Sequence, residues 1–161
     1  MFQVGPVEVD KAMLNDLYTK MTSSHEKYSY ATMMIKDKKV VIDELGAAQA
    51  TFDPAENEKL FNEMKARTAS KTRFIFFNFQ ILRPSGHKTQ DIAYIFWMDA
   101  GKVRIFEKPL YASTNNVVEK AITAFTDHDL SVPYFRCPDA FPFDYSALQA
   151  EMIKLALKGA L

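Results

Sequence analysis

The chain has 161 residues, of which 48% are hydrophobic and 25% charged, the composition of one soluble globular domain. Lysine plus arginine and aspartate plus glutamate each number 20, so the formal net charge is zero and the basic excess of a nucleic-acid-binding protein is missing. The single cysteine, Cys137, excludes an intrachain disulfide and suits a reducing compartment.

Targeting and membrane signals are not visible in the sequence. The first residues lack the basic start and long apolar run of a signal peptide. The longest apolar run, 92–98, has seven residues, whereas a helix that spans a bilayer needs about 20. We therefore expect one soluble domain over residues 1–161, located in the cytoplasm or the nucleus.

The first elements are a helix and a hairpin. Apolar residues at helical spacing predict a helix over 10–23, with Asp10 as its N-cap. Two short strands follow at 28–35 and 40–42, and the polar segment 36–39 between them has the length of a hairpin turn.

A second helix has strong start signals. Asp53 is a candidate N-cap, Pro54 occupies the first helical position, and Glu56 stands where a capping box has an acid. The residues that follow place a narrow apolar face on one side of this helix.

Two strongly apolar strands come next, at 73–81 and 91–98. The second is apolar at every position from Ile92, which is typical of a strand covered on both faces. Between the strands, 82–90 is predicted to be a polar loop. The four phenylalanines of the first strand resemble a base-stacking platform, but both faces of the strand are apolar, so we interpret them as core. They are Phe74, Phe76, Phe77 and Phe79.

The last part of the chain predicts two helices and a strand. The third helix covers at least 113–124, and a short strand is expected near 130–134. The last helix is predicted to start at Ser146, with Gln149 completing a capping box, and to end at Gly159. Hairpins separated by helices indicate an α/β fold, with a mixed sheet of about five strands and helices on both faces.

Residues for catalysis or metal binding are sparse. The three histidines, His25, His87 and His128, have no second His or Cys at metal-ligand spacing. Cys137 precedes Pro138 and is interpreted as an inert, buried thiol. No two glycines lie within four residues of each other, which excludes a phosphate-binding glycine loop. We expect no enzyme activity and no cofactor. A small enzyme with an unrecognised site around His128 and Cys137 remains as an alternative.

One stretch points to a family. The aromatic run 94–97 ends in Trp97, and Leu110-Tyr111-Ala112-Ser113-Thr114 follows thirteen residues later. This pattern resembles the ADF/cofilin family of actin-binding proteins, in which a similar strand leads into a long helix with a Tyr-Ala-Ser-Ser sequence. The segments 5–10, 73–74 and 128–130 also resemble family patterns, in the family's order.

The sequence departs from the family at several positions. The serine that is phosphorylated near the N-terminus of many members is replaced by Val4, so we expect that switch to be missing. The family's Ala-Pro segment before the long helix is missing too. Of a basic pair before the long helix, Lys108 matches one position and Phe106 occupies the other, while Arg104 can replace the lost charge. Pro109 stands where the family usually has Met; a helix tolerates proline in its first turn.

The resemblance implies two actin-binding surfaces and binding to both monomers and filaments, with severing or depolymerisation of filaments. The implied monomer-binding residues are Val4, Gly5, Arg104, Lys108, Pro109 and Asn115. The implied filament-binding residues are Arg83, Lys88, Glu151 and Lys154.

Other interpretations of the same residues stay open. Arg104 and Lys108 can be plain solvated charges, and the loop around Arg83 and Lys88 can be a plain polar hairpin. A coactosin- or glia-maturation-factor-like protein, which binds filaments or the branching complex without severing, is the nearest alternative. Together with Lys120, the basic residues of the long helix predict weak binding of phosphoinositides. We expect a monomer that binds no nucleic acid.

Overall fold

The structure is a computed structural model that describes residues 6–22, 28–99, 101–125 and 132–158. Four helices and five strands follow one another along these residues. They are α1 (Lys11–Thr22), β1 (Tyr30–Lys36), β2 (Lys39–Leu45), α2 (Pro54–Thr68), β3 (Thr72–Leu82), β4 (Lys88–Met98), α3 (Glu107–Phe125), β5 (Tyr134–Cys137) and α4 (Tyr145–Leu157).

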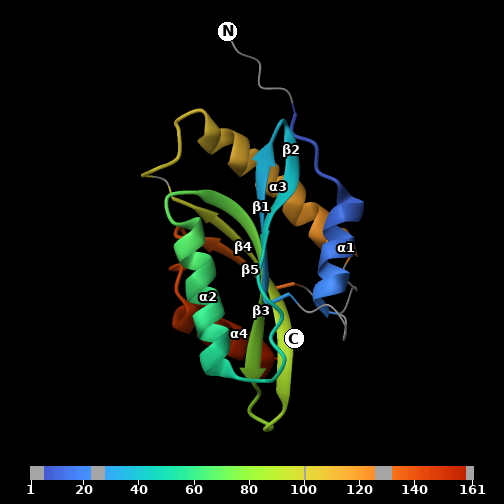
Figure 1. Cartoon of the computed structure of the whole chain (residues 1–161), viewed down its shortest axis with the longest axis vertical. Helices are drawn as coiled ribbons and strands as arrows, with labels where there is room; N and C mark the ends of the chain where they lie inside the picture. Colours follow the sequence, from blue (N-terminus) through green and yellow to red (C-terminus); the bar gives the residue numbers. More distant parts are fainter. Residues whose placement is uncertain (1–5, 23–27, 100, 126–131, 159–161) are drawn as a thin grey trace.

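A single mixed sheet lies at the centre of the molecule, in the order β2-β1-β3-β4-β5. The first four strands pair antiparallel with their neighbours, and β5 pairs parallel with β4 from Tyr94 to Trp97. Figure 1 shows α1 and α3 against one face of the sheet and α2 and α4 against the other. This is the α/β architecture predicted from the sequence.

Each face of the sheet carries its own apolar layer. On the α1–α3 side, the rings of Phe74 and Phe96 stack with their centroids 5.6 Å apart. On the α2–α4 side, Phe61 of α2 meets Phe77 edge to face at 5.0 Å and Phe143 at 5.4 Å. The four phenylalanines of β3 are all fully buried, so their interpretation as core residues is confirmed.

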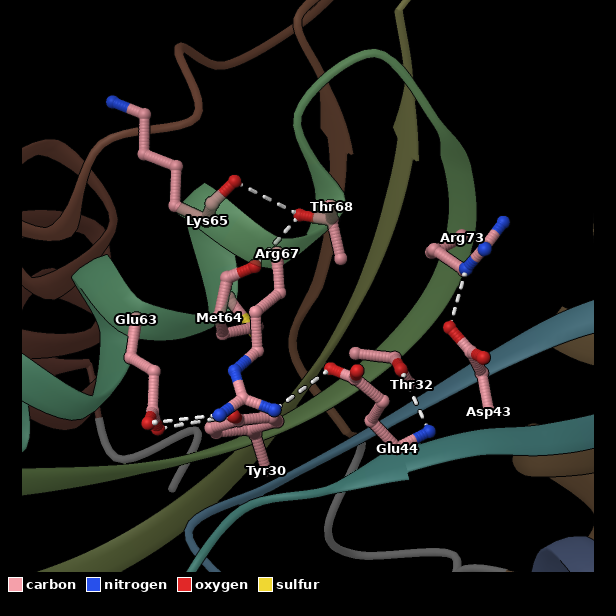
Figure 2. A network of polar contacts seen from close by, with 10 residues as sticks. All are labelled: Tyr30, Thr32, Asp43, Glu44, Glu63, Met64, Lys65, Arg67, Thr68 and Arg73. Atoms are coloured by element: carbon pink, nitrogen blue, oxygen red, sulfur yellow. Dashed lines mark hydrogen bonds and ion pairs between the residues drawn. The ribbon is translucent and has the colours of Figure 1, made fainter.

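Polar contacts fix α2 across the outer strands (Figure 2). The hydroxyl of Tyr30 on β1 donates to Glu63 of α2 at 3.0 Å. Arg67, one turn further along α2, reaches both Glu63 at 3.4 Å and Glu44 of β2 at 3.5 Å. Burial, followed by the hydrogen bond to Glu63, raises the pKa of the Tyr30 phenol to about 12. The buried phenol thus stays protonated at neutral pH and keeps its proton for Glu63.

The first two helices begin as predicted, with one difference. Asp10 accepts from Met13 N at 3.1 Å, and Asp53 accepts from Ala55 N and Glu56 N. The second half of the predicted capping box does not form, because Asp53 N donates to the buried side chain of Gln80 at 2.6 Å instead.

Three strands are longer than predicted, of which β3 gains one residue at each end. β2 runs to Leu45 and does not end at Ile42, because a bulge at Asp43 lets pairing with β1 resume beyond it. The Asp43 carboxylate there accepts from Arg73 of β3 at 2.9 Å. β4 begins at Lys88, so the predicted loop 82–90 shrinks to a tight turn at the end of a regular hairpin.

The prediction for the last strand and helix needs two corrections. β5 lies at Tyr134–Cys137, not near 130–134, and Pro133, which has no N–H, contributes only its carbonyl, which accepts from Tyr94 N at 2.8 Å. α4 is capped by Asp144, whose carboxylate accepts from Ala147 N at 3.1 Å, and not by Ser146. The predicted end at Gly159 lies outside the described residues.

Candidate functional site

The segment before α3 forms a compact turn that sets the start of the helix. Lys102 N and Val103 N both donate to Asp99 O at 3.0 Å. Arg104 O then accepts from Glu107 N at 3.0 Å and from Lys108 N at 3.3 Å. Pro109 is the third residue of the helix, where its missing N–H leaves no hydrogen bond unmade. The helix therefore starts six residues earlier than the minimum range predicted.

Side chains at this helix start are unusually open to solvent. Ile105 is 83% exposed and Phe106 is 62% exposed, and Arg104 and Pro109 beside them are also exposed. In the described part of the chain, neither Arg104 nor Lys108 forms a salt bridge. We call residues 104–109 the α3 start surface. Sequence reasoning treated Phe106 only as a lost charge and missed Ile105; two adjacent apolar residues outside any apolar periodicity were the available signal.

Hydrogen bonds hold α3 firmly on the sheet. The hydroxyl of Tyr111 accepts from Ile35 N of β1 at 3.2 Å. Asn115 accepts from the hydroxyl of Tyr94 at 2.5 Å and donates to the hydroxyl of Tyr134 at 2.7 Å. Burial raises the pKa of Tyr94 well above its usual value, so its proton stays in this bond. Asn115 is itself buried, so it positions the helix on the sheet and is not part of the exposed surface.

The turn between β3 and β4 carries the first of the residues implied in filament binding. Arg83 N donates to His87 O at 2.8 Å, and Gly86 accommodates a φ of +87°, which favours glycine. The Arg83 guanidinium folds back onto the hairpin, where it donates to Thr89 at 3.2 Å and lies 3.7 Å from Asp91. The charge of Arg83 is thus partly neutralised within the protein.

The other implied filament-binding residues also have local partners. Lys88 Nζ lies 5.5 Å from the ring centroid of Phe52. On α4, Lys154 and Glu151 form an ion pair at 3.1 Å. Figure 1 shows the β3–β4 turn and the first turn of α3 at opposite ends of the long axis of the molecule. Val4 and Gly5 lie outside the described residues.

The described residues give little support to the alternative of an enzyme site around His128 and Cys137. Cys137 is buried, and burial raises the pKa of its thiol to about 12, so it is not a nucleophile at neutral pH. His128 lies outside the described residues. Within the described ranges, no group of three or more His, Cys, Asp and Glu side chains is placed to hold a metal ion. Of the helices described, none is long and apolar enough to cross a bilayer.

Comparison with known proteins gives one family match. The family model described as "Cofilin/tropomyosin-type actin-binding protein" matches residues 6–132. This range covers α1 to α3 and ends before β5. A search of curated proteins found no sequence match.

Solved structures with the same fold cover nearly the whole chain. Actin depolymerization factor 2 of Plasmodium berghei shares 18% identity over 98% of this chain and 96% of its own, with a TM-score of 0.66. The ADF-like UNC-60A protein of Caenorhabditis elegans shares 17% sequence identity over 94% of this chain and 97% of its own, with a TM-score of 0.67. Human coactosin-like protein shares 14% sequence identity over 92% of this chain and 98% of its own, with a TM-score of 0.66.

Proposed function

The chain belongs to the cofilin/tropomyosin-type family of actin-binding proteins, and from that premise we propose that it binds monomeric and filamentous actin and promotes filament severing or depolymerisation. The observation that carries the proposal is the α3 start surface, where two cations without a described salt-bridge partner flank two exposed apolar side chains. Solvent-exposed apolar residues beside charges are typical of a surface that docks into a partner.

The mechanism of such a protein is binding alone. A ligand shifts an equilibrium between two states only by its difference in affinity for them. Preferential binding to a twisted filament would weaken contacts between neighbouring actin subunits and so promote disassembly. This role needs two surfaces, one to hold a subunit and one to contact its neighbour along the filament.

We propose the α3 start surface, together with the segment around Val4 and Gly5, as the monomer contact. Phe106 and Ile105 would enter an apolar cleft, and Arg104 and Lys108 would meet acidic residues at its rim. The hairpin surface, defined as Arg83 and Lys88 with Glu151 and Lys154 of α4, is the proposed filament contact. The β3–β4 turn, which Arg83 and Lys88 flank, lies at the other end of the long axis from the first turn of α3, and this supports a separate role (Figure 1).

Coactosin-like binding, in which the protein decorates filaments without severing them, is the second candidate. It is favoured by Phe106, which stands where the resemblance implies a basic residue and is 62% exposed. A monomer contact with fewer charges could be too weak for depolymerisation, leaving filament binding alone.

Three measurements on the purified protein distinguish the candidates. Co-sedimentation with filaments measures filament binding, titration of fluorescently labelled monomeric actin measures monomer affinity, and microscopy of single filaments counts severing events. Our proposal expects all three activities. Filament binding without monomer binding or severing supports the second candidate, and no interaction with either form of actin contradicts both.

Within a cell, we propose that the protein acts in the cytoplasm on the actin cytoskeleton, as a monomer. Phosphoinositide headgroups would compete weakly for the basic residues of the α3 start surface and for Lys120, which is exposed further along α3.

A further inference from the structure

Polar residues gather where β1 leaves the edge of β3. β1 pairs with β3 only from Tyr30 to Met33. At the Tyr30 end of this pairing, Ser29 O still accepts from Asn78 N at 2.9 Å. The side chain of Asn57 on α2 then takes the place of the strand, donating to Asn78 O at 2.9 Å and accepting from Gln80 N at 3.2 Å. Asn57, Asn78 and Gln80 are all buried. Each polar atom here therefore needs a hydrogen-bond partner.

A small cavity lies inside this polar cluster. Its volume is about 10 Å³, at the lower limit of what one water molecule needs. No residue among the described ones that line it carries a formal charge, so nothing there balances a metal cation. The lining residues are Ser29, Gln49, Asn57, Asn78, Gln80 and Gln90.

Two buried polar atoms on residues that line the cavity have no partner among the described residues. They are Ser29 Oγ and Asn78 Oδ1, on residues that are only 3% and 6% exposed. The other end of the Asn78 amide donates to Gln90 Oε1 at 3.2 Å. Rotating this amide by 180° exchanges its two ends but still leaves one end without a partner. Two such groups beside one cavity strongly favour a small ligand that both donates and accepts.

We propose that this cavity binds one structural water molecule, which donates to Asn78 Oδ1 and shares a second hydrogen bond with the Ser29 hydroxyl. The water completes the hydrogen bonding at the point where β1 and β3 separate. It also joins this point to the side chains of Gln49 and Gln80, which hold the segment before α2.

The first test observes the water directly in the parent protein. With ¹⁵N-labelled protein, a water-selective NMR experiment should transfer magnetisation from a long-lived water to the side-chain amide of Asn78, which is buried away from bulk solvent. No transfer to this amide, while exposed amides respond, would overturn the proposal.

The second test compares two buried hydroxyls that lack a partner. Thr72 Oγ1 is also buried and unpartnered, but Thr72 does not line the cavity. A bound water makes Ser29→Ala destabilising, with a thermal midpoint lower by about 2–6 °C, because the water loses a partner. Thr72→Val removes an unsatisfied hydroxyl without disturbing a water, so its midpoint should stay unchanged or rise.

Two results from measurements of the thermal midpoint would contradict the proposal. If Ser29→Ala raises the midpoint as Thr72→Val does, the cavity is dry. If replacing sodium by choline at equal ionic strength lowers the midpoint of the parent protein but not of Ser29→Ala, the cavity binds a cation and not water.

Discussion

At the α3 start surface, Arg104 and Lys108 flank two exposed apolar side chains and form no salt bridge with a described residue. At the hairpin surface the charges have partners within the chain: Arg83 lies against Asp91, and Lys154 against Glu151. An arginine that already has a carboxylate partner gains less from a second one, because the first contact must be weakened or shared.

This difference separates two kinds of binding surface. The α3 start surface combines apolar area with free charge, which favours a strong contact with one actin subunit. Exposed ion pairs such as Glu151–Lys154 contribute little to stability, so they can exchange partners at small cost and suit a weaker, reversible contact. We therefore expect larger losses from changes at the α3 start surface than at the hairpin surface.

The largest effect is expected from reversing charge at the α3 start surface. Arg104→Glu with Lys108→Glu should lower affinity for monomeric actin at least about tenfold, because reversed charges at an interface repel an acidic partner. Lys59→Glu with Lys65→Glu makes the same change in net charge on exposed positions of α2 and is the matched control. Unchanged affinity in the first variant, with a native circular dichroism spectrum, would show that this surface does not bind the monomer.

Removing an exposed ring tests the apolar half of the same surface. Phe106→Ser should lower monomer affinity about three- to tenfold without changing the thermal midpoint, because the ring packs against little in the free protein. Leu157→Ser, at a residue that is 64% exposed on α4, is the control and should leave monomer affinity unchanged. Equal losses in the two variants would indicate a general effect of exposed apolar residues.

The hairpin surface should respond in the filament assay alone. Arg83→Ala with Lys88→Ala should reduce filament co-sedimentation about threefold and leave monomer affinity intact, since the β3–β4 turn and the first turn of α3 lie at opposite ends of the molecule. Asp91→Asn sharpens the test, because it removes the ion-pair partner of Arg83 and leaves the charge of Arg83 in place. This variant should preserve filament binding. Parallel losses in both assays would mean that the two surfaces form a single site.

The N-terminal segment is expected to contribute a smaller, severalfold effect. Val4→Glu should weaken monomer binding, because a charge would enter an apolar contact. Val4→Leu keeps the apolar character and should bind like the parent protein in the same titration. If Val4→Glu binds equally well, this segment is not part of the monomer contact.

Competition by phosphoinositides should be the weakest effect. Vesicles with anionic headgroups should displace monomeric actin only partly, and less at higher salt, because three basic residues each contribute about 1 kcal/mol. The variant Lys120→Ala should be displaced less than the parent protein. Vesicles of neutral lipid are the control. Displacement that does not depend on salt would argue against an electrostatic contact.

The fold could be predicted from the sequence largely because its local signals agree with the tertiary structure. Asp10 and Asp53 cap the helices that their positions predict, and the apolar run from Ile92 forms the buried part of β4. Prediction was wrong where a distant residue decides the outcome. The side chain of Gln80 accepts the hydrogen bond from the backbone N–H of Asp53. The position of β5 is determined by its pairing with β4.

The candidate site was predictable only in part. The position of Arg104 and Lys108 at the start of a long helix followed from the resemblance, and the structure describes such a helix. The burial of Asn115 and the ion pair of Arg83 depend on contacts with Tyr134 and Asp91, and no residue spacing in the sequence reveals which way a side chain turns.

The parallel pairing of β5 with β4 has a practical consequence for the choice of fragment boundaries. The family match ends at 132, two residues before β5 begins, so a fragment cut there would lose the outermost strand together with α4. The backbone of β4 from Tyr94 to Trp97 would then become an open edge of apolar residues, ready to pair with other chains. Expressed fragments that stop at the family boundary should precipitate, whereas those that extend through Leu157 should stay soluble.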